Sequence, residues 1–242
     1  MQELRCLIVE YYDFNPFLAD SWLSTQVYDS ANVGEISEDL CTSHSRCIFV
    51  VELDLNLRAK MFNRKASKPE NQPEQVVESL GLKEGDCVAD IGSGGGYFTM
   101  RFAKRVASQG TVYAVDTDAD MLDYVKETSE KEGLANVETV LVTPSEIDLP
   151  RKGLDLVFTR NAYHHLENPV GYFTSLKHFL KPNGRVAILE YRKAGGIFRR
   201  IFGHYVEKKQ IVQDMKGAGY QLQEEFDFLP EQSFTIYSPN NE

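Results

Sequence analysis

From residue 70 onward, short runs of apolar residues alternate with longer segments in which apolar positions recur every three or four residues. Runs that are apolar throughout predict strands buried on both faces of a sheet, and the segments between them predict amphipathic helices. This alternation predicts a doubly wound, Rossmann-like α/β fold with a mostly parallel sheet. The five expected strands cover 87–92, 111–116, 136–142, 154–159 and 185–191.

The segments between and after these strands predict five helices, several of which begin at a proline or an acid and end at a glycine. Two further apolar runs, at 219–228 and 233–238, predict a terminal pair of strands around the sequence LPEQ. The expected helices cover 69–82, 96–108, 119–133, 169–184 and 207–217.

Residues 1–58 differ in composition from the rest of the chain. They hold ten acids and three arginines, a net charge of −7 out of −10 for the whole chain, and three of the four cysteines. Apolar runs at 6–9 and 47–55 predict two short strands there. We therefore predict an N-terminal extension of unknown role over 1–58 and a main domain over 59–242.

Composition narrows the class of protein. The chain of 242 residues is 42% hydrophobic and 26% charged, which is ordinary for a globular protein, and its pI of about 5.1 argues against nucleic acid as a partner. No apolar run approaches the roughly 20 residues of a membrane span, and the start of the chain lacks the pattern of a signal peptide. Scattered cysteines give no disulfide framework, so we expect a cytoplasmic protein.

Residues 90–98, DIGSGGGYF, place an acid and four glycines directly after the first strand. Glycines permit a sharp turn and close approach of a ligand, and the helix that follows offers free N–H groups. Asp90 would repel a pyrophosphate but would pair with an ammonium or a sulfonium. The dinucleotide fingerprint would also need a glycine where Tyr97 stands. The turn therefore favours a cationic ligand.

Asp116 ends the second strand, twenty positions after Gly96. A carboxylate at this place can accept both hydroxyls of an unphosphorylated ribose. The alternative is a solvated carboxylate at the start of the next helix, since Asp118 and Asp120 follow. We favour the ribose role because it coincides with the glycine turn at the expected separation.

Four stretches in this order, VADIGSGGGYFT, GTVYAVDTDADML, LDLVFTRNAYHHL and LKPNGRVAILEYRK, resemble the successive motifs of class I S-adenosylmethionine-dependent methyltransferases. The resemblance covers about 70–238, and residues 203–230 resemble the quinone-methylase-like, small-molecule branch. It implies a seven-stranded sheet with an antiparallel C-terminal strand, in agreement with the terminal strand pair. It also implies S-adenosylmethionine as the cofactor.

The resemblance further implies where the cofactor lies, with its amino-acid part at the glycine turn and its ribose at Asp116. Relatives commonly carry an acid for the adenine amino group after the third strand, whereas this chain has Thr143, with Ser145 and Glu146 close behind. A hydroxyl can still accept that hydrogen bond. The implied cofactor residues are Asp90, Gly92, Ser93, Gly94, Gly96, Asp116, Thr117, Thr143 and Arg160.

Tyr163, His164 and His165 follow the fourth strand, where the family opens to the methyl acceptor. A histidine could remove a proton from a hydroxyl, thiol or amine as the methyl group arrives. The alternative is a structural histidine that packs or caps the loop. Both interpretations stay open, and His204 and Tyr205 are further candidates for the acceptor pocket.

Residues 192–209 carry six basic residues and one acid, interleaved with apolar residues at helical spacing. A lid over the substrate, a site for an acidic substrate, peripheral membrane contact and a simply packed helix all fit this composition. Cys41, His44 and Cys47 match no zinc spacing, so no metal site is predicted.

We predict a methyltransferase that moves the methyl group of S-adenosylmethionine to a small molecule and releases S-adenosylhomocysteine. One rival is a catalytically silent protein that binds S-adenosylmethionine or a partner, with 1–58 as its interaction element. The other is a nucleotide-dependent oxidoreductase, which Asp90 and the absent third glycine disfavour. The sequence identifies neither the acceptor nor the oligomeric state.

Overall fold

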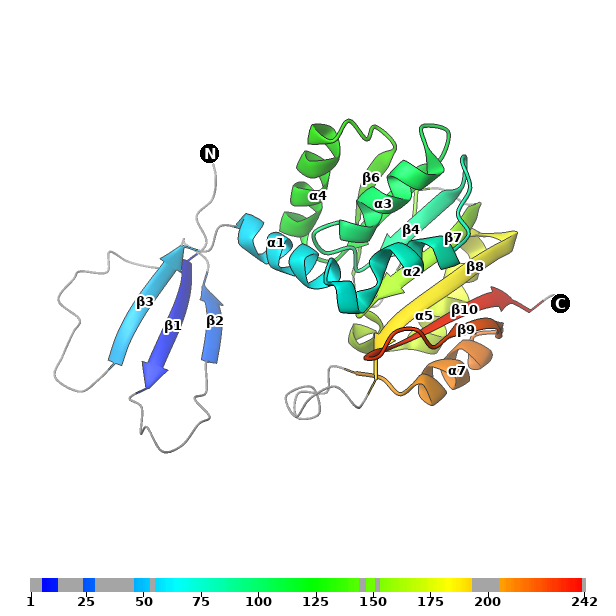
Figure 1. Ribbon diagram of the computed structural model, residues 1–242. Coiled ribbons are helices and arrows are strands. Elements are labelled where there is room, and N and C mark those ends of the chain that lie inside the picture. The colour runs from blue at the N-terminus through cyan, green and yellow to red at the C-terminus, as the bar shows by residue number, and fades with distance from the viewer. Residues whose placement is uncertain are drawn as a thin grey trace. The chain divides into compact units, whose positions relative to one another are not determined.

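The computed structural model describes residues 6–12, 24–28, 46–52, 55–143, 147–150, 153–192 and 205–240 (Figure 1). The chain divides into two compact units, Met1–Leu57 and Arg58–Glu242. In the described part of the chain, no helix is long and apolar enough to cross a membrane.

The first unit holds a three-stranded antiparallel sheet in the order β2-β1-β3. The two apolar runs predicted as strands fall in β1 and β3, whereas no pattern predicted β2. The bounds are β1 (Cys6–Tyr12), β2 (Ser24–Tyr28) and β3 (Arg46–Glu52), and α1 (Leu55–Ala66) follows.

The second unit is built on a seven-stranded sheet in the order β6-β5-β4-β7-β8-β10-β9. Neighbouring strands are parallel from β6 to β8, and β10 is antiparallel to both β8 and β9. The predicted fold class is therefore confirmed, including the antiparallel C-terminal strand. The strands are β4 (Cys87–Ile91), β5 (Thr111–Asp116), β6 (Val137–Leu141), β7 (Leu154–Arg160), β8 (Leu180–Tyr191), β9 (Tyr220–Phe226) and β10 (Gln232–Pro239).

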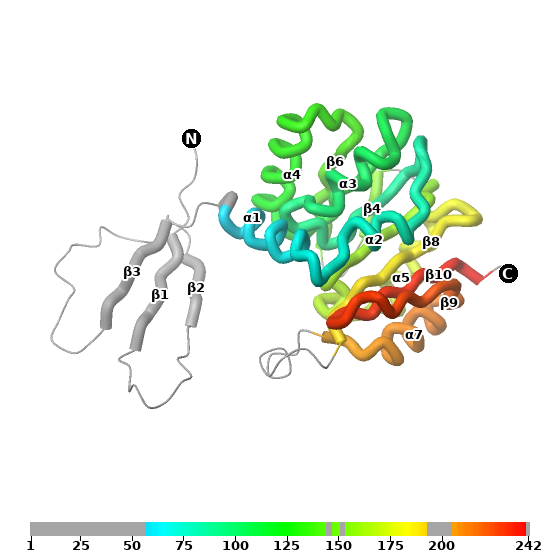
Figure 2. Tube along the Cα trace, in the orientation of Figure 1, coloured from blue at the N-terminus to red at the C-terminus, as the bar shows by residue number. Residues whose placement is uncertain are grey.

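Helices cover both faces of this sheet. Side chains alternate between the two faces along each strand, so apolar strands place apolar side chains on both faces. Val88 belongs to the apolar cluster under α2 and α3, whereas the next residue, Ala89, belongs to the cluster under α5 and α7. Figures 1 and 2 show these two helix layers on opposite sides of the strands. The helices are α2 (Pro73–Ser79), α3 (Tyr97–Val106), α4 (Ala119–Lys131), α5 (Pro169–Leu176) and α7 (Lys208–Gly217), with 3-10 turns at Pro69–Asn71, Tyr163–His165 and Lys177–Phe179.

The helix predicted over 169–184 ends earlier, so the prediction was wrong at its C-terminal end. α5 stops at Leu176, and β8 already begins at Leu180. Two tertiary contacts account for this: Leu180 pairs with Leu154 of β7, and the Lys181 ammonium lies 2.6 Å from the Asp155 carboxylate. Pairing between two interior strands of the sheet therefore overrides local helical periodicity.

The strand order places a topological switch point beside β4. The chain runs outward from β4 through β5 to β6 and then returns to form β7 on the other side of β4. In open parallel sheets, ligands bind at the carboxyl ends of the strands next to such a point. The carboxyl ends of β4, β5 and β7 therefore lie at the same edge of the sheet, and they carry Asp90, Asp116 and Arg160.

Candidate functional site

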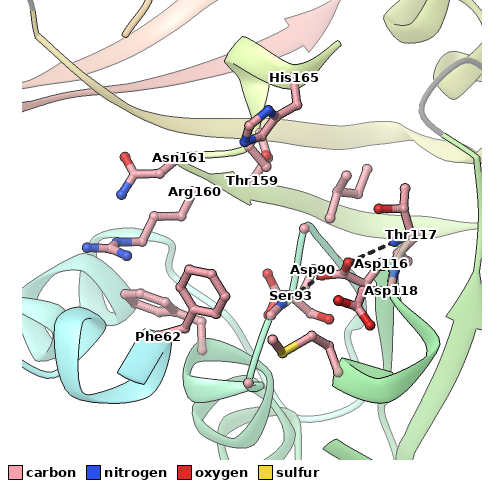
Figure 3. A pocket seen from close by; sticks show the side chains of 18 of the residues that line it. Phe62, Asp90, Ser93, Asp116, Thr117, Asp118, Thr159, Arg160, Asn161 and His165 are labelled. Carbon is pink, nitrogen blue, oxygen red and sulfur yellow. Dashed lines mark hydrogen bonds between the residues drawn. The ribbon is translucent and has the colours of Figure 1, made fainter. Parts of the chain in front are cut away.

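A cavity of about 1010 Å³ lies at the carboxyl ends of β4, β5 and β7. Figure 3 shows Asp116, Thr117 and Asp118 on one side of it and Arg160 and Phe62 on the other. Of the residues that the sequence predicts for the cofactor, the cavity is lined by Asp90, Gly92, Ser93, Gly94, Asp116, Thr117, Thr143 and Arg160.

Asp90 is buried at the centre of this arrangement, with 3% of its surface exposed. The Thr99 hydroxyl donates a hydrogen bond of 2.6 Å to its carboxylate. Burial raises the pKa of Asp90 to about 7, because desolvation outweighs the opposing effect of the Thr99 hydrogen bond. A cationic ligand would restore the charged form, so Asp90 suits an ammonium or sulfonium.

The glycine turn lets neighbouring elements approach closely. A Cβ on Gly92 would lie 2.4 Å from the Ala162 Cβ. The turn can therefore pack this closely against the loop after β7 only because residue 92 has no side chain. A Cβ on Gly95 would lie 2.5 Å from the Ala59 carbonyl oxygen of α1. The turn therefore brings the loop after β7 and α1 to the cavity.

Gly96 has a different role from its neighbours. Gly96 is the N-cap of α3 and has a φ of +76°. A Cβ added to it would lie 2.8 Å from the Val125 Cγ2 of α4. Gly96 is not among the residues that line the cavity. The structure thus places it where α3 and α4 pack together, and not at the surface of the pocket.

Asp116 ties the ends of two strands together. Its Oδ2 accepts a hydrogen bond of 2.8 Å from the Gly94 N–H, and its Oδ1 accepts from the N–H groups of Thr117 and Asp118 at 2.8 and 3.1 Å (Figure 3). The carboxylate at the helix start belongs to Asp118, which accepts from the Asp120 N–H. The N-cap of α4 is therefore Asp118, whereas Asp116 accepts the N–H groups of the two residues that precede this helix.

Thr143 lies in the cavity wall after β6, beside Val142. This is the position at which the resemblance implies contact with adenine. Ser145 and Glu146, which stand close behind in the sequence, lie outside the described residues.

His164 is held by a buried carboxylate that the sequence did not single out. Its Nδ1 lies 3.1 and 3.2 Å from the two Glu190 oxygens, and the Glu190 side chain is fully buried. The Tyr191 N–H donates to the same carboxylate at 2.8 Å. A carboxylate at Nδ1 favours the tautomer that carries its proton there, which leaves Nε2 as the basic nitrogen. The contact with Glu190 thus fixes the orientation of the His164 ring.

The other three predicted acceptor-side residues differ in placement. His165 lines the cavity, and its ring centroid lies 4.1 Å from that of His164 (Figure 3). Tyr163 is buried away from the cavity lining, where its hydroxyl donates to the Asp214 carboxylate at 2.8 Å and its ring stacks on Phe173. His204 lies outside the described residues, as does most of the basic segment.

The α1 helix contributes to the cavity although no sequence pattern pointed to it. Asn63 donates a hydrogen bond of 2.7 Å to the Gly95 carbonyl, and the Arg58 guanidinium pairs with Asp118 at 3.1 Å. Phe62 lines the cavity with 48% of its surface exposed. Residues from Arg58 to Ala66 therefore form one wall of the site.

Among the described residues, no group of three or more histidine, cysteine, aspartate or glutamate side chains could hold a metal ion. Cys41 and His44 lie outside those residues.

The sheet order with its antiparallel β10, and a carboxylate set into the glycine turn, are the arrangement of class I S-adenosylmethionine-dependent methyltransferases. A family model described as "Methyltransferase domain" matches residues 82–230, which is more than half of the chain, so the chain belongs to this family. Membership implies S-adenosylmethionine as the cofactor.

Individual relatives are distant. The chain is 27% identical over 155 residues to the ubiquinone/menaquinone biosynthesis C-methyltransferase UbiE of Francisella philomiragia, a match that spans 61% of this chain and 62% of that protein's length. A SAM-dependent methyltransferase from Aquifex aeolicus is 26% identical with a TM-score of 0.67, over 76% of this chain and 98% of the other. The [4+2]-cyclase SpnF is 20% identical with a TM-score of 0.56, over 66% and 59%, which shows the fold alone.

The raised pKa of Asp90 predicts a pH-dependent cost to stability. The folded chain keeps the proton up to about pH 7, whereas the unfolded chain loses it near pH 4, so stability falls as pH rises through this range. Asp90→Asn removes the titrating group. Relative to wild type, we expect this variant to gain roughly 2–4 kcal/mol of stability between about pH 4.5 and pH 8.

Urea unfolding at both pH values measures this gain. Asp123→Asn, at an exposed position on α4, is the control and should show no such gain. A stability difference between Asp90→Asn and wild type that does not change with pH would contradict the assignment.

Proposed function

We propose that this protein transfers the methyl group of S-adenosylmethionine to a small-molecule acceptor and releases S-adenosylhomocysteine. The observation that carries the proposal is the joint placement of buried Asp90 and braced Asp116 in one cavity at the switch point of the sheet. When bound, S-adenosylmethionine supplies a methyl group on a sulfonium, which is an electrophile.

The cavity residues divide between the parts of the cofactor. In this proposal Asp90, Ser93 and the turn glycines hold the amino-acid end, because a buried carboxylate and open backbone suit an ammonium group. Asp116 accepts the ribose hydroxyls, with Thr117 beside it. Thr143 takes the adenine amino group, as its hydroxyl can accept a hydrogen bond.

His164 is the base of the proposed reaction, and Glu190 is its positioning residue. The acceptor's nucleophilic atom forms a bond to the methyl carbon as the carbon–sulfur bond breaks, and the electron pair stays on sulfur. The proton leaves the acceptor for the His164 Nε2, and the buried Glu190 carboxylate stabilises the resulting imidazolium. His165 lines the same part of the cavity and contacts the acceptor.

A small acceptor is supported by two observations. The cavity of about 1010 Å³ is at the upper end of the range for small-molecule sites, so it suits a cofactor together with a compact second substrate. The relatives with curated names include UbiE proteins, which are named for methylation at carbon in ubiquinone and menaquinone biosynthesis. We extend this class, a small organic acceptor, to the present chain.

In the proposed organisation, residues 59–242 form the methyltransferase domain and 1–58 form an N-terminal extension of unknown role, whose last residue, Arg58, lines the cavity. The family match at 82–230 lies wholly within the larger part. All the cavity-lining residues that the structure describes also follow residue 57.

A screen for transfer of a tritiated methyl group tests the function. The full chain is incubated with labelled S-adenosylmethionine and with phenols, quinols, thiols or arsenite, and label in the acceptor is counted. The proposal expects label in at least one small-molecule class. Binding of the cofactor with no transfer to any of them would favour a silent binding protein instead.

Replacement of Asp116 tests the ribose assignment. Asp116→Ala should weaken binding of S-adenosylhomocysteine by about 1–3 kcal/mol, because charge-assisted hydrogen bonds to the ribose are lost. Titration calorimetry measures the affinity, and thermal unfolding checks that the turn at Gly94 survives. Asp118→Ala, which removes the neighbouring carboxylate, is the control with a smaller effect. Equal affinity for wild type and Asp116→Ala would refute the assignment.

The His164–Glu190 pair predicts a non-additive loss of activity with a hydroxyl or carbon-acid acceptor. His164→Gln and Glu190→Gln should each lower kcat by about 10²–10⁴-fold, with little change in the KM for S-adenosylmethionine. The double variant should be no slower than the slower single variant, because both changes remove one unit. His178→Gln, at an exposed position outside the cavity lining, serves as the matched control. Additive losses in a double-mutant cycle would show that the two residues act separately.

A further inference from the structure

Arg160 presents an unsatisfied pair of hydrogen-bond donors at the cavity. The residue ends β7 and lines the cavity wall. Its Nε and Nη2 are buried, and neither has a hydrogen-bond partner among the described residues. These two nitrogens stand on the same side of the planar guanidinium, so their N–H bonds point in parallel.

The surroundings of Arg160 are largely aromatic. Its guanidinium carbon lies 5.7 Å from the centre of the Phe98 ring, and Tyr97, Phe62 and Tyr191 line the same cavity. Figure 3 shows the guanidinium next to Phe62, on the side of the cavity away from Asp116. Burial lowers the pKa of Arg160, and the nearby charges of Glu190 and Asp90 act in the opposite direction.

A partly buried guanidinium with two shielded, unmatched donors is unfavourable by itself, because those N–H groups lose contact with water without gaining a partner. An apolar side chain would fill this space without that cost. The arrangement becomes favourable when a ligand supplies oxygen atoms to both nitrogens. Two parallel N–H groups match the two oxygens of a carboxylate, and such bidentate pairs are among the stronger hydrogen bonds in proteins.

We propose that the methyl acceptor is a small carboxylic acid whose carboxylate is held by the Arg160 Nε and Nη2, with its apolar body against Phe62, Tyr97 and Phe98. This inference rests on the proposed function. Arg160 already lines the cavity, and the proposal requires its side chain to turn so that the two shielded nitrogens face the ligand. The bound carboxylate also offsets the repulsion between the guanidinium and the sulfonium.

The cofactor's own methionine carboxylate is the other source of the same chemistry. We favour the acceptor because the guanidinium extends toward α1 and Phe62, whereas Asp90 and Ser93, the proposed contacts of the cofactor's amino-acid end, lie beside Asp116 on the other side of the cavity (Figure 3). The experiment distinguishes the two sources.

Titration calorimetry on the full chain, saturated with S-adenosylhomocysteine, compares carboxylic acids with their neutral amides, beginning with 3-phenylpropionate and 3-phenylpropanamide. Wild type should bind acids at least about tenfold more tightly than the matched amides. Arg160→Gln should abolish this preference, and Arg160→Lys should keep a weaker one. Arg101→Gln is the control, because Arg101 stacks on Tyr97 and pairs with Glu74 outside the cavity lining.

A second titration series measures S-adenosylhomocysteine against 5′-methylthioadenosine, which lacks the amino-acid part. The proposal expects Arg160→Gln to bind both within about threefold of wild type. Selective loss of S-adenosylhomocysteine affinity, by about tenfold or more, would assign Arg160 to the cofactor carboxylate and overturn the inference. So would equal affinity of wild type for acids and amides, or an acid preference that survives in Arg160→Gln.

An error in the proposed methyltransferase function would give a different experimental result from an error in the assignment of Arg160. A wild-type chain that binds no S-adenosylhomocysteine contradicts the proposed function itself, whereas every outcome against the inference leaves that binding intact. The Arg160→Gln variant should unfold at the same temperature as wild type or higher, because it removes two buried N–H groups that have no hydrogen-bond partner in the described part of the chain.

Discussion

The hydrogen bond from the Gly94 N–H to the Asp116 carboxylate joins the ends of the two strands on which the site depends. It connects the glycine turn after β4 to the end of β5, and two more N–H groups hold the same carboxylate. The turn can then receive the loop after β7 at Gly92 and α1 at Gly95, since neither glycine carries a side chain. The cavity is a consequence of these close approaches.

The charges in the cavity follow the same geometry. Carboxylates lie at the ends of β4 and β5, and the arginine lies at the end of β7, so acid and cation face the cavity from different sides (Figure 3). A positively charged methyl donor near the acids and an anionic acceptor near Arg160 would each meet an opposite charge. Desolvation strengthens both attractions, and it also opposes the charged form of Asp90, whose pKa it raises.

The sequence predicted the fold and much of the site because both depend on local patterns. Apolar runs predicted the strands from β4 to β8. Polar residues at the carboxyl ends of these strands, such as Asp90, Asp116 and Arg160, predicted the residues that line the cavity. Glu190 could not be found in this way, since its contact with His164 depends on parallel pairing of β7 with β8, where Arg160 stands opposite Leu189. The sequence did not predict that α1 forms a wall of the cavity. The contacts of α1 with the turn come from the Ala59 carbonyl and the Asn63 side chain, and neither belongs to a pattern of apolar positions. The end of α5 was misplaced because sheet pairing at Leu180 is equally non-local.

The fold does not by itself define the reaction, because the [4+2]-cyclase SpnF shares it. The central claim is that the cavity binds S-adenosylmethionine through Asp90 and Asp116. The most direct test is titration calorimetry of the full chain with S-adenosylmethionine and, separately, with NAD. We expect saturable binding of S-adenosylmethionine and no binding of NAD. Tight binding of NAD without binding of S-adenosylmethionine would contradict the account.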